Sequence, residues 1–230
     1  MSKVRFDTSM AENQFSREEI QAMRRSYGEV GLNQLDPDPF LAFTDWLRQA
    51  HENPMIVEAN AMVLSTLGSE LDISTRTVLL KDISEGGFTF FTNYDSRKAH
   101  AMQNNEQVSL LFPWYAMERQ VSISGVSAKV SQKESEDYFA SRPWASQIGA
   151  WASHQSSPLA SREELEQRYE GAAKKWPDGT TVPCPSHWGG FRVIPLSIEF
   201  WQGRYSRLHD RLRYERHNTN GDWELNRYYP

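Results

Sequence analysis

Three cationic side chains near the C-terminus are spaced so that they could hold an anion. Arg207, His209 and Arg211 are separated by single residues. In an extended strand they would share one face, and Leu208 and Asp210 would share the other. Like charges in a row repel one another, so a phosphate or an electron-rich ring is expected among them. The spacing alone fits a solvent-exposed basic strand equally well.

A second candidate anion site lies at the start of a predicted helix. Ser96 is a suitable N-cap, and Arg97 and Lys98 follow it, although the helix dipole at this end favours anions. A phosphate held by the free N–H groups of the first turn and by both cations would compensate this charge. The alternative is that both side chains extend into water.

Two further sets of side chains suit phosphate binding. Arg76 and Lys81 have an odd separation, so a regular strand would place them on opposite faces, toward two ligands or toward one ligand and solvent. Tyr138 and Arg142 are four residues apart on a predicted helix, and Ser146 follows shortly after. These three would offer two hydroxyls and a guanidinium to a second anion. The alternative is a surface stack of Tyr138 on Arg142.

The elements that must position these groups follow from periodicity, capping residues and turn residues. Ser16 with Glu19, Ser131 with Glu134, and Ser161 with Glu164 have the spacing of capping boxes. Short strands joined by tight turns favour a barrel or sandwich, and Gly125 would allow a strand to bend at a corner. The predicted helices are 16–27, 39–51, 96–104, 131–141 and 161–175; the predicted strands are 61–67, 75–81, 87–93, 107–112, 120–130, 197–202, 207–216 and 222–228.

Composition narrows the class of protein. The chain has 230 residues, a net charge of −5 and an isoelectric point near 5.7, which argue against a general binder of nucleic acid or of membrane surfaces. No apolar run could span a bilayer, and Cys184 is the single cysteine. We therefore expect a cytoplasmic protein with a mobile tail over residues 1–15 and one domain over residues 16–230.

Several kinds of site have no support in the sequence. There is no Gly-x-Gly-x-x-Gly after a strand, no phosphate loop of the Walker type and no serine in a nucleophile elbow. The six histidines are scattered, so no metal site is expected. His209 remains a candidate general acid or base, and its cationic neighbours favour the neutral ring. The remaining pattern is two anion sites beside an aromatic-rich barrel, which suits a phosphorylated cofactor and a phosphorylated substrate.

The same residues resemble the signature of pyridoxamine 5′-phosphate oxidases. The matching blocks run in the order of that family from about residue 20 to the C-terminus. They are residues 76–81 (RTVLLK), 91–93 (FTN), 96–99 (SRKA), 109–114 (SLLFPW), 118–121 (ERQV), 141–143 (SRP), 146–151 (SQIGAW), 188–192 (WGGFR), 198–202 (IEFWQ) and 207–211 (RLHDR). Glu58 departs from the pattern, since many relatives have Asp there, and it is left out of the predicted site.

This resemblance implies a fold and a set of ligand contacts. The implied fold is mainly β with peripheral helices, an FMN-binding split barrel that works as a homodimer with FMN at the subunit interface. The implied FMN contacts are Arg76, Thr77, Val78, Leu79, Leu80, Lys81, Phe91, Thr92, Arg97, Lys98, Gln120, Gln155, Ser156, Trp201 and Arg211. The implied substrate contacts are Arg24, Tyr27, Lys81, Tyr138, Arg142, Ser146, Arg207, Leu208 and His209.

The resemblance also implies the reaction. Pyridoxamine 5′-phosphate or pyridoxine 5′-phosphate would be oxidised to pyridoxal 5′-phosphate, with dioxygen as acceptor and hydrogen peroxide, plus ammonia from the amine, as products. Arg207 and His209 would be the catalytic residues, while Arg24 and Tyr27 on the N-terminal helix would close over the site. The alternatives are another flavin-dependent reductase on the same barrel and a non-catalytic carrier of FMN or pyridoxal phosphate.

Overall fold

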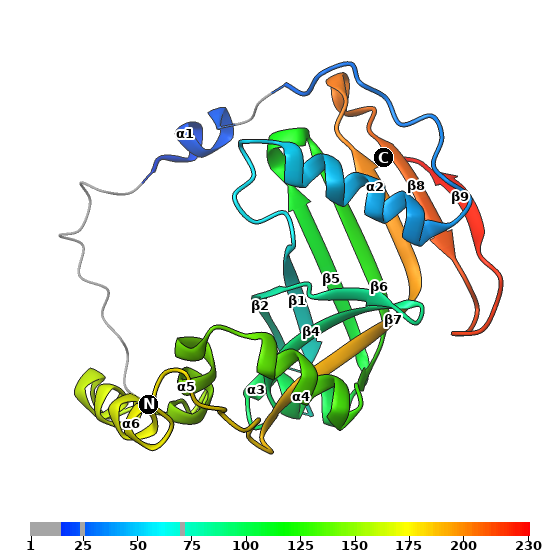
Figure 1. Ribbon diagram of the computed structural model, residues 1–230. Coiled ribbons are helices and arrows are strands. Elements are labelled where there is room, and N and C mark those ends of the chain that lie inside the picture. Colours follow the sequence, from blue (N-terminus) through cyan, green and yellow to red (C-terminus); the bar gives the residue numbers. More distant parts are fainter. Residues whose placement is uncertain (1–14, 24–25, 70–71) are drawn as a thin grey trace.

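The computed structural model describes residues 15–23, 26–69 and 72–230, and Figure 1 shows the arrangement of its elements. Within these residues the helices and strands are as follows: α1 Arg17–Ala22, α2 Pro39–Glu52, β1 Ala61–Leu67, β2 Ile73–Leu79, β3 Asp82–Ser84, β4 Gly87–Asn93, α3 Arg97–Asn104, β5 Gln107–Trp114, η2 Tyr115–Met117, β6 Arg119–Lys129, α4 Gln132–Ser141, α5 Trp144–Ala152, α6 Arg162–Lys175, β7 Trp188–Gln202, η3 Tyr205–Arg207, β8 Asp210–Glu215 and β9 Glu224–Tyr228.

The described strands form one antiparallel sheet that curls into a half-barrel. Its order is β2-β1-β5-β6-β7-β4-β3, and β8 joins β7 and carries β9. The 15-residue β7 pairs with β6 along one edge, while its other edge pairs first with β4 and then with β8. As Figure 1 shows, β7 therefore runs from the end of the sheet covered by α3 and α4 to the end where β8 and β9 lie.

One helix closes the main core over the sheet. The predicted apolar side of α2 is confirmed, since Phe43 and Trp46 are buried and Phe40 and Leu47 pack against the core. Phe43 meets Phe88 and Phe112 edge-on, each with ring centroids 4.9 Å apart. A smaller cluster around Phe139 and Trp188 joins α4, α5 and α6 to the opposite end of the sheet.

Helix starts agree closely with the sequence. Ser16 and Ser131 each form the reciprocal capping box with a glutamate three residues later, and Ser161 accepts the N–H of Glu164. Asp38 caps α2 ahead of Pro39. These starts are predictable because each depends on groups within a few residues of one another.

The length of the first helix was predicted wrongly. α1 ends at Ala22 with Met23 as its C-cap, so Tyr27 lies outside the helix. None of the residues of α1 is buried. Because helices in proteins are stabilised mainly by packing of an apolar face, nothing favours extension of this short helix beyond Ala22. Arg24, predicted to share a helical face with Tyr27, lies outside the described residues.

A long strand replaces the predicted strand 197–202. Gly189, Gly190 and Pro195 are residues that weaken strands, and the structure places all three in β7. Pro195 lies at a register shift opposite Gly125, where a missing N–H is tolerated. A Cβ on Gly125 would lie 2.2 Å from the carbonyl oxygen of Ile194. The predicted strand irregularity at Gly125 is present as this register shift, and the close contact with β7 requires a glycine there.

The strand predicted for residues 207–216 is also wrong at its start. β8 begins at Asp210, and residues Gly203 to His209 form a loop that contains η3. Ser206 and Arg207 have φ values of 57° and 62°, which are not strand conformations. The N–H of Tyr205 donates to the carbonyl of Gly28, so the loop bonds to the N-terminal segment instead of to a strand.

Candidate active site

A cavity of about 990 Å³, called here the anion cavity, brings together most of the predicted phosphate-binding residues. It lies where β2 and β4 meet α3, α4 and α5. The predicted residues that line it are Arg76, Thr77, Val78, Leu79, Lys81, Phe91, Thr92, Arg97, Lys98, Tyr138, Arg142, Ser146, Gln155 and Ser156. Leu80 does not line it and is buried in the core.

Arg76 and Lys81 line the same cavity because the chain leaves the β2 ladder between them. β2 ends at Leu79, after which the N–H of Leu80 donates to Asn60 and that of Lys81 to Thr89. The hydrogen-bonding partner of the chain thus changes from the segment at the start of β1 to β4. The alternation of side chains in a regular strand therefore does not apply between Leu79 and Lys81. The expectation that the two cations face opposite sides was therefore wrong.

Lys98 is partly buried, and this burial favours a negatively charged partner beside its ammonium group. Its Nζ donates to the Gln155 Oε1 at 2.9 Å, the Thr92 Oγ1 at 3.1 Å and the Ser96 Oγ at 3.3 Å. All three acceptors are neutral. Burial, together with the positive charge of Arg76, lowers the pKa of Lys98 to about 8. A negative group beside Lys98 would restore its full charge.

The start of α3 also leaves room for an anion. Ser96 occupies the N-cap position, but its side chain makes no capping hydrogen bond and its Oγ instead donates to Asn93. Arg76 donates to the carbonyl of Leu64 and to two hydroxyls. Arg97 turns away to an exposed ion pair with Asp72. Two of the three predicted phosphate cations here, Arg76 and Lys98, thus have only neutral partners among the described residues.

A second group of cationic and hydroxyl side chains lies on another wall of the anion cavity. The Arg142 guanidinium lies 4.6 Å from the Trp188 ring centroid, and its buried Nη1 has no hydrogen-bond partner among the described residues. Burial lowers the pKa of Arg142. Tyr138 stacks on Phe91 with centroids 4.0 Å apart instead of on Arg142. An anionic oxygen would satisfy the orphaned donor of Arg142.

α5 carries Ser146 into the cavity, although this helix was not predicted. Its N-cap is Pro143, which is not a capping residue that a sequence pattern reveals. The Gln147 side chain donates to the carbonyls of Phe139, Ala140 and Arg142 and so joins the start of α5 to the end of α4. These bonds satisfy carbonyls at the end of α4, and the N-terminus of α5 has no side-chain cap.

A second cavity of about 1140 Å³, called here the loop cavity, contains both predicted catalytic residues. Tyr27, Gln120, Trp201, Arg207 and His209 all line it. Trp201 and His209 have ring centroids 4.7 Å apart, and Tyr27 meets both rings edge-on at 5.7 and 5.5 Å. The predicted association of Tyr27 with His209 is thus present, without a helix to carry it.

One hydrogen bond fixes the orientation of the His209 ring. The backbone N–H of Arg204 donates to its Nδ1 at 3.0 Å, so Nδ1 acts as an acceptor. The Nε2 atom is then the one left to donate or relay a proton.

The row of three cations on one strand face is not formed. Arg207 and His209 lie in the loop, while Arg211 lies on β8 and pairs with Glu199 at 2.8 Å. Burial opposes ionisation of Glu199, but hydrogen bonds from Arg211 and Arg213 outweigh burial and lower its pKa. Leu208, predicted to contact substrate, is 64% exposed and does not line the loop cavity.

The two cavities lie at opposite ends of β7. Phe91 of the anion cavity pairs with Gly190, whereas Gln120 of the loop cavity pairs with Trp201. Eleven residues separate Gly190 from Trp201, or roughly 35 Å along an extended strand. The cavities share no lining residue. Within one chain the predicted phosphate groups and the predicted catalytic groups are thus apart.

Two of the lining residues that the predicted site did not include have a structural role. Trp188, which lies in the matched block 188–192, supports Arg142. Glu118 has φ 54° and accepts the N–H of Gly28 at 2.8 Å, which joins the N-terminal segment to the loop cavity. No local pattern marks a positive φ at a glutamate.

Across residues 15–23, 26–69 and 72–230, no group of three or more His, Cys, Asp or Glu side chains is placed to hold a metal ion. None of the helices in the same ranges has the length and apolar character needed to cross a bilayer.

Comparison with known families covers nearly the whole chain. The family described as "Pyridoxamine 5'-phosphate oxidase" matches residues 49–175, and the "Pyridoxine 5'-phosphate oxidase C-terminal dimerisation region" matches residues 188–230. A protein of Nocardioides sp. named pyridoxine/pyridoxamine 5′-phosphate oxidase is 50% identical over 214 residues, covering 92% of this chain and 98% of its own length. A protein of the same name from Streptomyces avermitilis is 47% identical, covering 91% and 95%.

Solved structures agree on the fold. PhzG from Burkholderia lata 383, solved in complex with tetrahydrophenazine-1-carboxylic acid, superposes with a TM-score of 0.78 at 30% identity, covering 85% of this chain and 94% of its own. A pyridoxamine 5′-phosphate oxidase-related, FMN binding protein from Nostoc punctiforme gives 0.67 at 16% identity, covering 86% and 100%. The predicted mainly β split barrel with peripheral helices is confirmed.

Proposed function

The chain belongs to the pyridoxine/pyridoxamine 5′-phosphate oxidase family, and from this premise we propose that it oxidises pyridoxamine 5′-phosphate and pyridoxine 5′-phosphate to pyridoxal 5′-phosphate. FMN is the proposed cofactor and dioxygen the proposed electron acceptor. Hydrogen peroxide, together with ammonia from the amine, is the expected by-product.

One observation carries this proposal: the anion cavity contains two separate sets of cationic and hydroxyl groups. A reaction between two phosphorylated molecules needs two phosphate sites within one cavity. Arg76 and Lys98 form one set at the start of α3. Lys81, Tyr138, Arg142 and Ser146 form the other.

The residues of the first set fit FMN. Lys98 has a lowered pKa and only neutral partners, and the N-terminus of α3 has no side-chain cap, as expected of a site built for a phosphate. Thr92, Gln155 and Ser156 would add hydrogen bonds. When bound, FMN supplies the two-electron chemistry and transfers the electrons to dioxygen.

The second set would hold the substrate phosphate. The buried Nη1 of Arg142 has no partner within the described part of the chain, and Tyr138 and Ser146 offer hydroxyl donors. We call Lys81, Tyr138, Arg142 and Ser146 the phosphate clamp. Charge-assisted contacts of this kind fix the position of a small substrate and raise the effective concentration of its reacting carbon.

Arg207 and His209 would act at the substrate ring. Arg207 would stabilise negative charge that develops there, and His209 would move a proton through Nε2. Both lie in the loop cavity, about one strand length from the phosphate clamp of the same chain. The active site is therefore proposed to form in a homodimer, where the loop cavity of one protomer meets the anion cavity of its partner. The match of residues 188–230 to a dimerisation region supports this arrangement.

An oxidation assay tests the proposal. Purified protein loaded with FMN, given pyridoxamine 5′-phosphate under air, should form pyridoxal 5′-phosphate and an equal amount of peroxide. If the protein were a reductase for another substrate, its flavin would be reduced only by a different electron donor. If it were a carrier, it would bind FMN or pyridoxal phosphate without turnover. Protein that binds FMN but forms no aldehyde from either vitamer phosphate would contradict the proposed function.

A further inference from the structure

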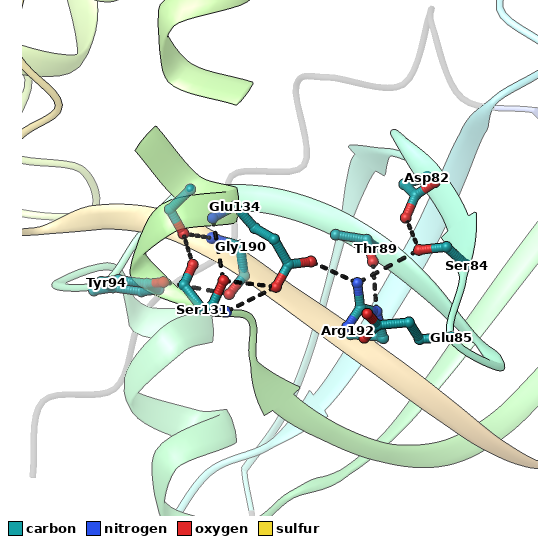
Figure 2. A network of polar contacts seen from close by, with 10 residues as sticks. Asp82, Ser84, Glu85, Thr89, Tyr94, Ser131, Glu134, Gly190 and Arg192 are labelled. Carbon is teal, nitrogen blue, oxygen red and sulfur yellow. Dashed lines mark hydrogen bonds and ion pairs between the residues drawn. The ribbon is translucent and has the colours of Figure 1, made fainter. Parts of the chain in front are cut away.

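A network of polar contacts centred on Arg192 lies outside both cavities (Figure 2). Arg192 belongs to β7, and its side chain is only 11% exposed. It forms ion pairs with Glu85 and with Glu134, the latter at 2.6 Å between Nη2 and Oε1. Its Nε also donates to the Thr89 hydroxyl at 3.3 Å. One guanidinium thus joins three elements: β7, the β3–β4 hairpin and α4.

The contact with Glu134 joins Arg192 to the start of α4. Glu134 is the third residue of this helix, and its other oxygen accepts the N–H and the hydroxyl of the N-cap Ser131. Next to it, the Ser135 hydroxyl accepts the N–H of Gly190 at 3.2 Å. Figure 2 shows Glu134 between Ser131 and Arg192. The first turn of α4 is therefore held on β7 at two successive positions.

The glycines of β7 permit this close approach of helix and strand. A Cβ on Gly189 would lie 2.1 Å from the Tyr94 hydroxyl and 2.7 Å from the Ser135 Oγ. A Cβ on Gly190 would lie 2.9 Å from the Phe91 ring. The sequence Trp188 to Arg192 therefore combines a helix-docking surface with the cation that holds the helix there.

The contact with Glu85 joins Arg192 to the tip of the β3–β4 hairpin. Glu85 and Gly86 both have positive φ in the turn, and the Ser84 hydroxyl lies 3.5 Å from the Arg192 Nη2. At Gly87 a Cβ would lie 2.6 Å from the Cγ of Arg192. The absence of a side chain at Gly87 thus leaves room for the Arg192 side chain to lie against the hairpin.

Both joined elements carry phosphate-clamp residues. Lys81 comes directly before β3, and its N–H donates to the carbonyl of Thr89 at 2.8 Å. Tyr138 is four residues after Glu134, so it lies on the same face of α4, where it stacks on Phe91 of β4. Arg142 is the C-cap of α4. The separation between Lys81 and the residues of α4 depends on how the hairpin and helix are joined.

We propose that Arg192 is a positioning residue that sets the geometry of the phosphate clamp through its paired contacts with Glu85 and Glu134. This inference rests on the proposed function, because it concerns the same substrate site. Arginine is suited to the task because its planar fork binds two carboxylates in fixed directions, whereas lysine offers a point charge.

The test compares R192K with the wild type, both loaded with FMN. R192K keeps the charge but loses the fork, so we expect the KM for pyridoxine 5′-phosphate to rise about tenfold while kcat changes less than about threefold. The dissociation constant of pyridoxal 5′-phosphate should rise in parallel. The FMN affinity, measured by quenching of flavin fluorescence, should stay within about threefold, because the proposed FMN phosphate cations Arg76 and Lys98 lie on β2 and α3, which the Arg192 network does not touch.

E134Q provides a second variant in case R192K folds poorly, and we expect the same split between KM and kcat. K133A is the matched control, since Lys133 lies on the same turn of α4 but, among the residues that the structure describes, forms its ion pair with the exposed Asp137. It should match the wild type. Combining R192K with E134Q should raise KM little beyond either single variant, because both act through one contact.

The outcomes separate this inference from the proposed function. If R192K and E134Q melt at lower temperature with an unchanged KM, or if KM and the FMN dissociation constant rise together, the positioning role is wrong. If the wild type oxidises neither vitamer phosphate, the proposed function fails. Binding of pyridoxal 5′-phosphate to the FMN-loaded variants would then still support or overturn the role of Arg192.

Discussion

The anion cavity and the loop cavity differ in how their side chains are held. In the anion cavity, strands of the sheet and three helices present groups that are stacked or multiply hydrogen bonded, such as Lys98, Tyr138 and Arg142. In the loop cavity, Arg207 is exposed and lies in a short loop with two non-glycine residues at positive φ. The N-terminal segment that borders this loop follows a helix with no buried residue.

This difference suggests a division of work between the two regions. The proposed phosphate ligands would be bound by groups held in place before the ligand arrives, which reduces the entropy lost on binding. The groups nearest the proposed chemistry lie in segments with few packed contacts, which are the segments that can adjust during opening and closing. Variants of the two cavities should therefore affect different kinetic constants.

The largest expected effect is on the loop cavity. Arg207→Ala should lower kcat by about 10²-fold or more, because it removes a positioned electrostatic donor. The FMN affinity should change little, since Arg207 does not line the anion cavity. Steady-state kinetics and fluorescence quenching measure the two quantities. Near-normal turnover in this variant would remove Arg207 from the mechanism.

Mixing the two kinds of variant tests whether the cavities act together across subunits. At a substrate concentration well below the wild-type KM, Arg207→Ala and Arg142→Met chains should each show little activity alone. Co-refolded in equal amounts, they should regain about a quarter of wild-type activity, because half the dimers would contain one intact site of two. The measurement is specific activity after mixing, with each variant mixed with itself as the control. If mixed dimers of confirmed composition regain no activity, the active site would instead use the two cavities of the same chain.

The phosphate clamp should show the opposite kinetic pattern. Arg142→Met should raise the KM for pyridoxine 5′-phosphate by about 10- to 100-fold, the usual cost of losing a charge-assisted hydrogen bond. Pyridoxine without its phosphate should be used equally poorly by the wild type and the variant. An equal loss of activity toward both compounds would indicate a general defect and not a phosphate contact.

The smallest predicted effect concerns pH and the FMN site. The pKa of Lys98 is about 8 without ligand, and a phosphate beside it would raise this value by stabilising the ammonium. FMN binding above pH 8 must then take up a proton, so the affinity should be constant just below pH 8 and fall by up to about tenfold per unit above it. Fluorescence quenching between pH 7 and 9.5 measures this slope. Lys98→Arg, which stays charged over this range, should abolish the fall in affinity above pH 8. An unchanged slope in this variant would mean that another group takes up the proton on FMN binding.

Much of the anion cavity was predictable from the sequence. The capping pair Ser131 and Glu134 sets the start of α4 and hence the common face of Glu134 and Tyr138. The placement of Arg76, Lys98 and Arg142 in one cavity was expected from the family resemblance, and local spacing alone left each of them an exposed alternative. α5 was missed because its N-cap is Pro143, which is not a capping residue that a sequence pattern reveals.

The sequence by itself determined the starts of α1, α2, α3, α4 and α6 and the apolar face of α2, because these depend on groups within a few residues of one another. Its short strands and tight turns also indicated an antiparallel sheet. Only the tertiary structure decided the path of residues 203–209. There, the N–H of Tyr205 donates to the carbonyl of Gly28, and the N–H of Gly203 donates to the carbonyl of Glu118. An alternating pattern of charges predicts a strand face, but backbone groups that bond to distant segments in this way do not form a strand ladder, and Arg207 and His209 are therefore separated from Arg211.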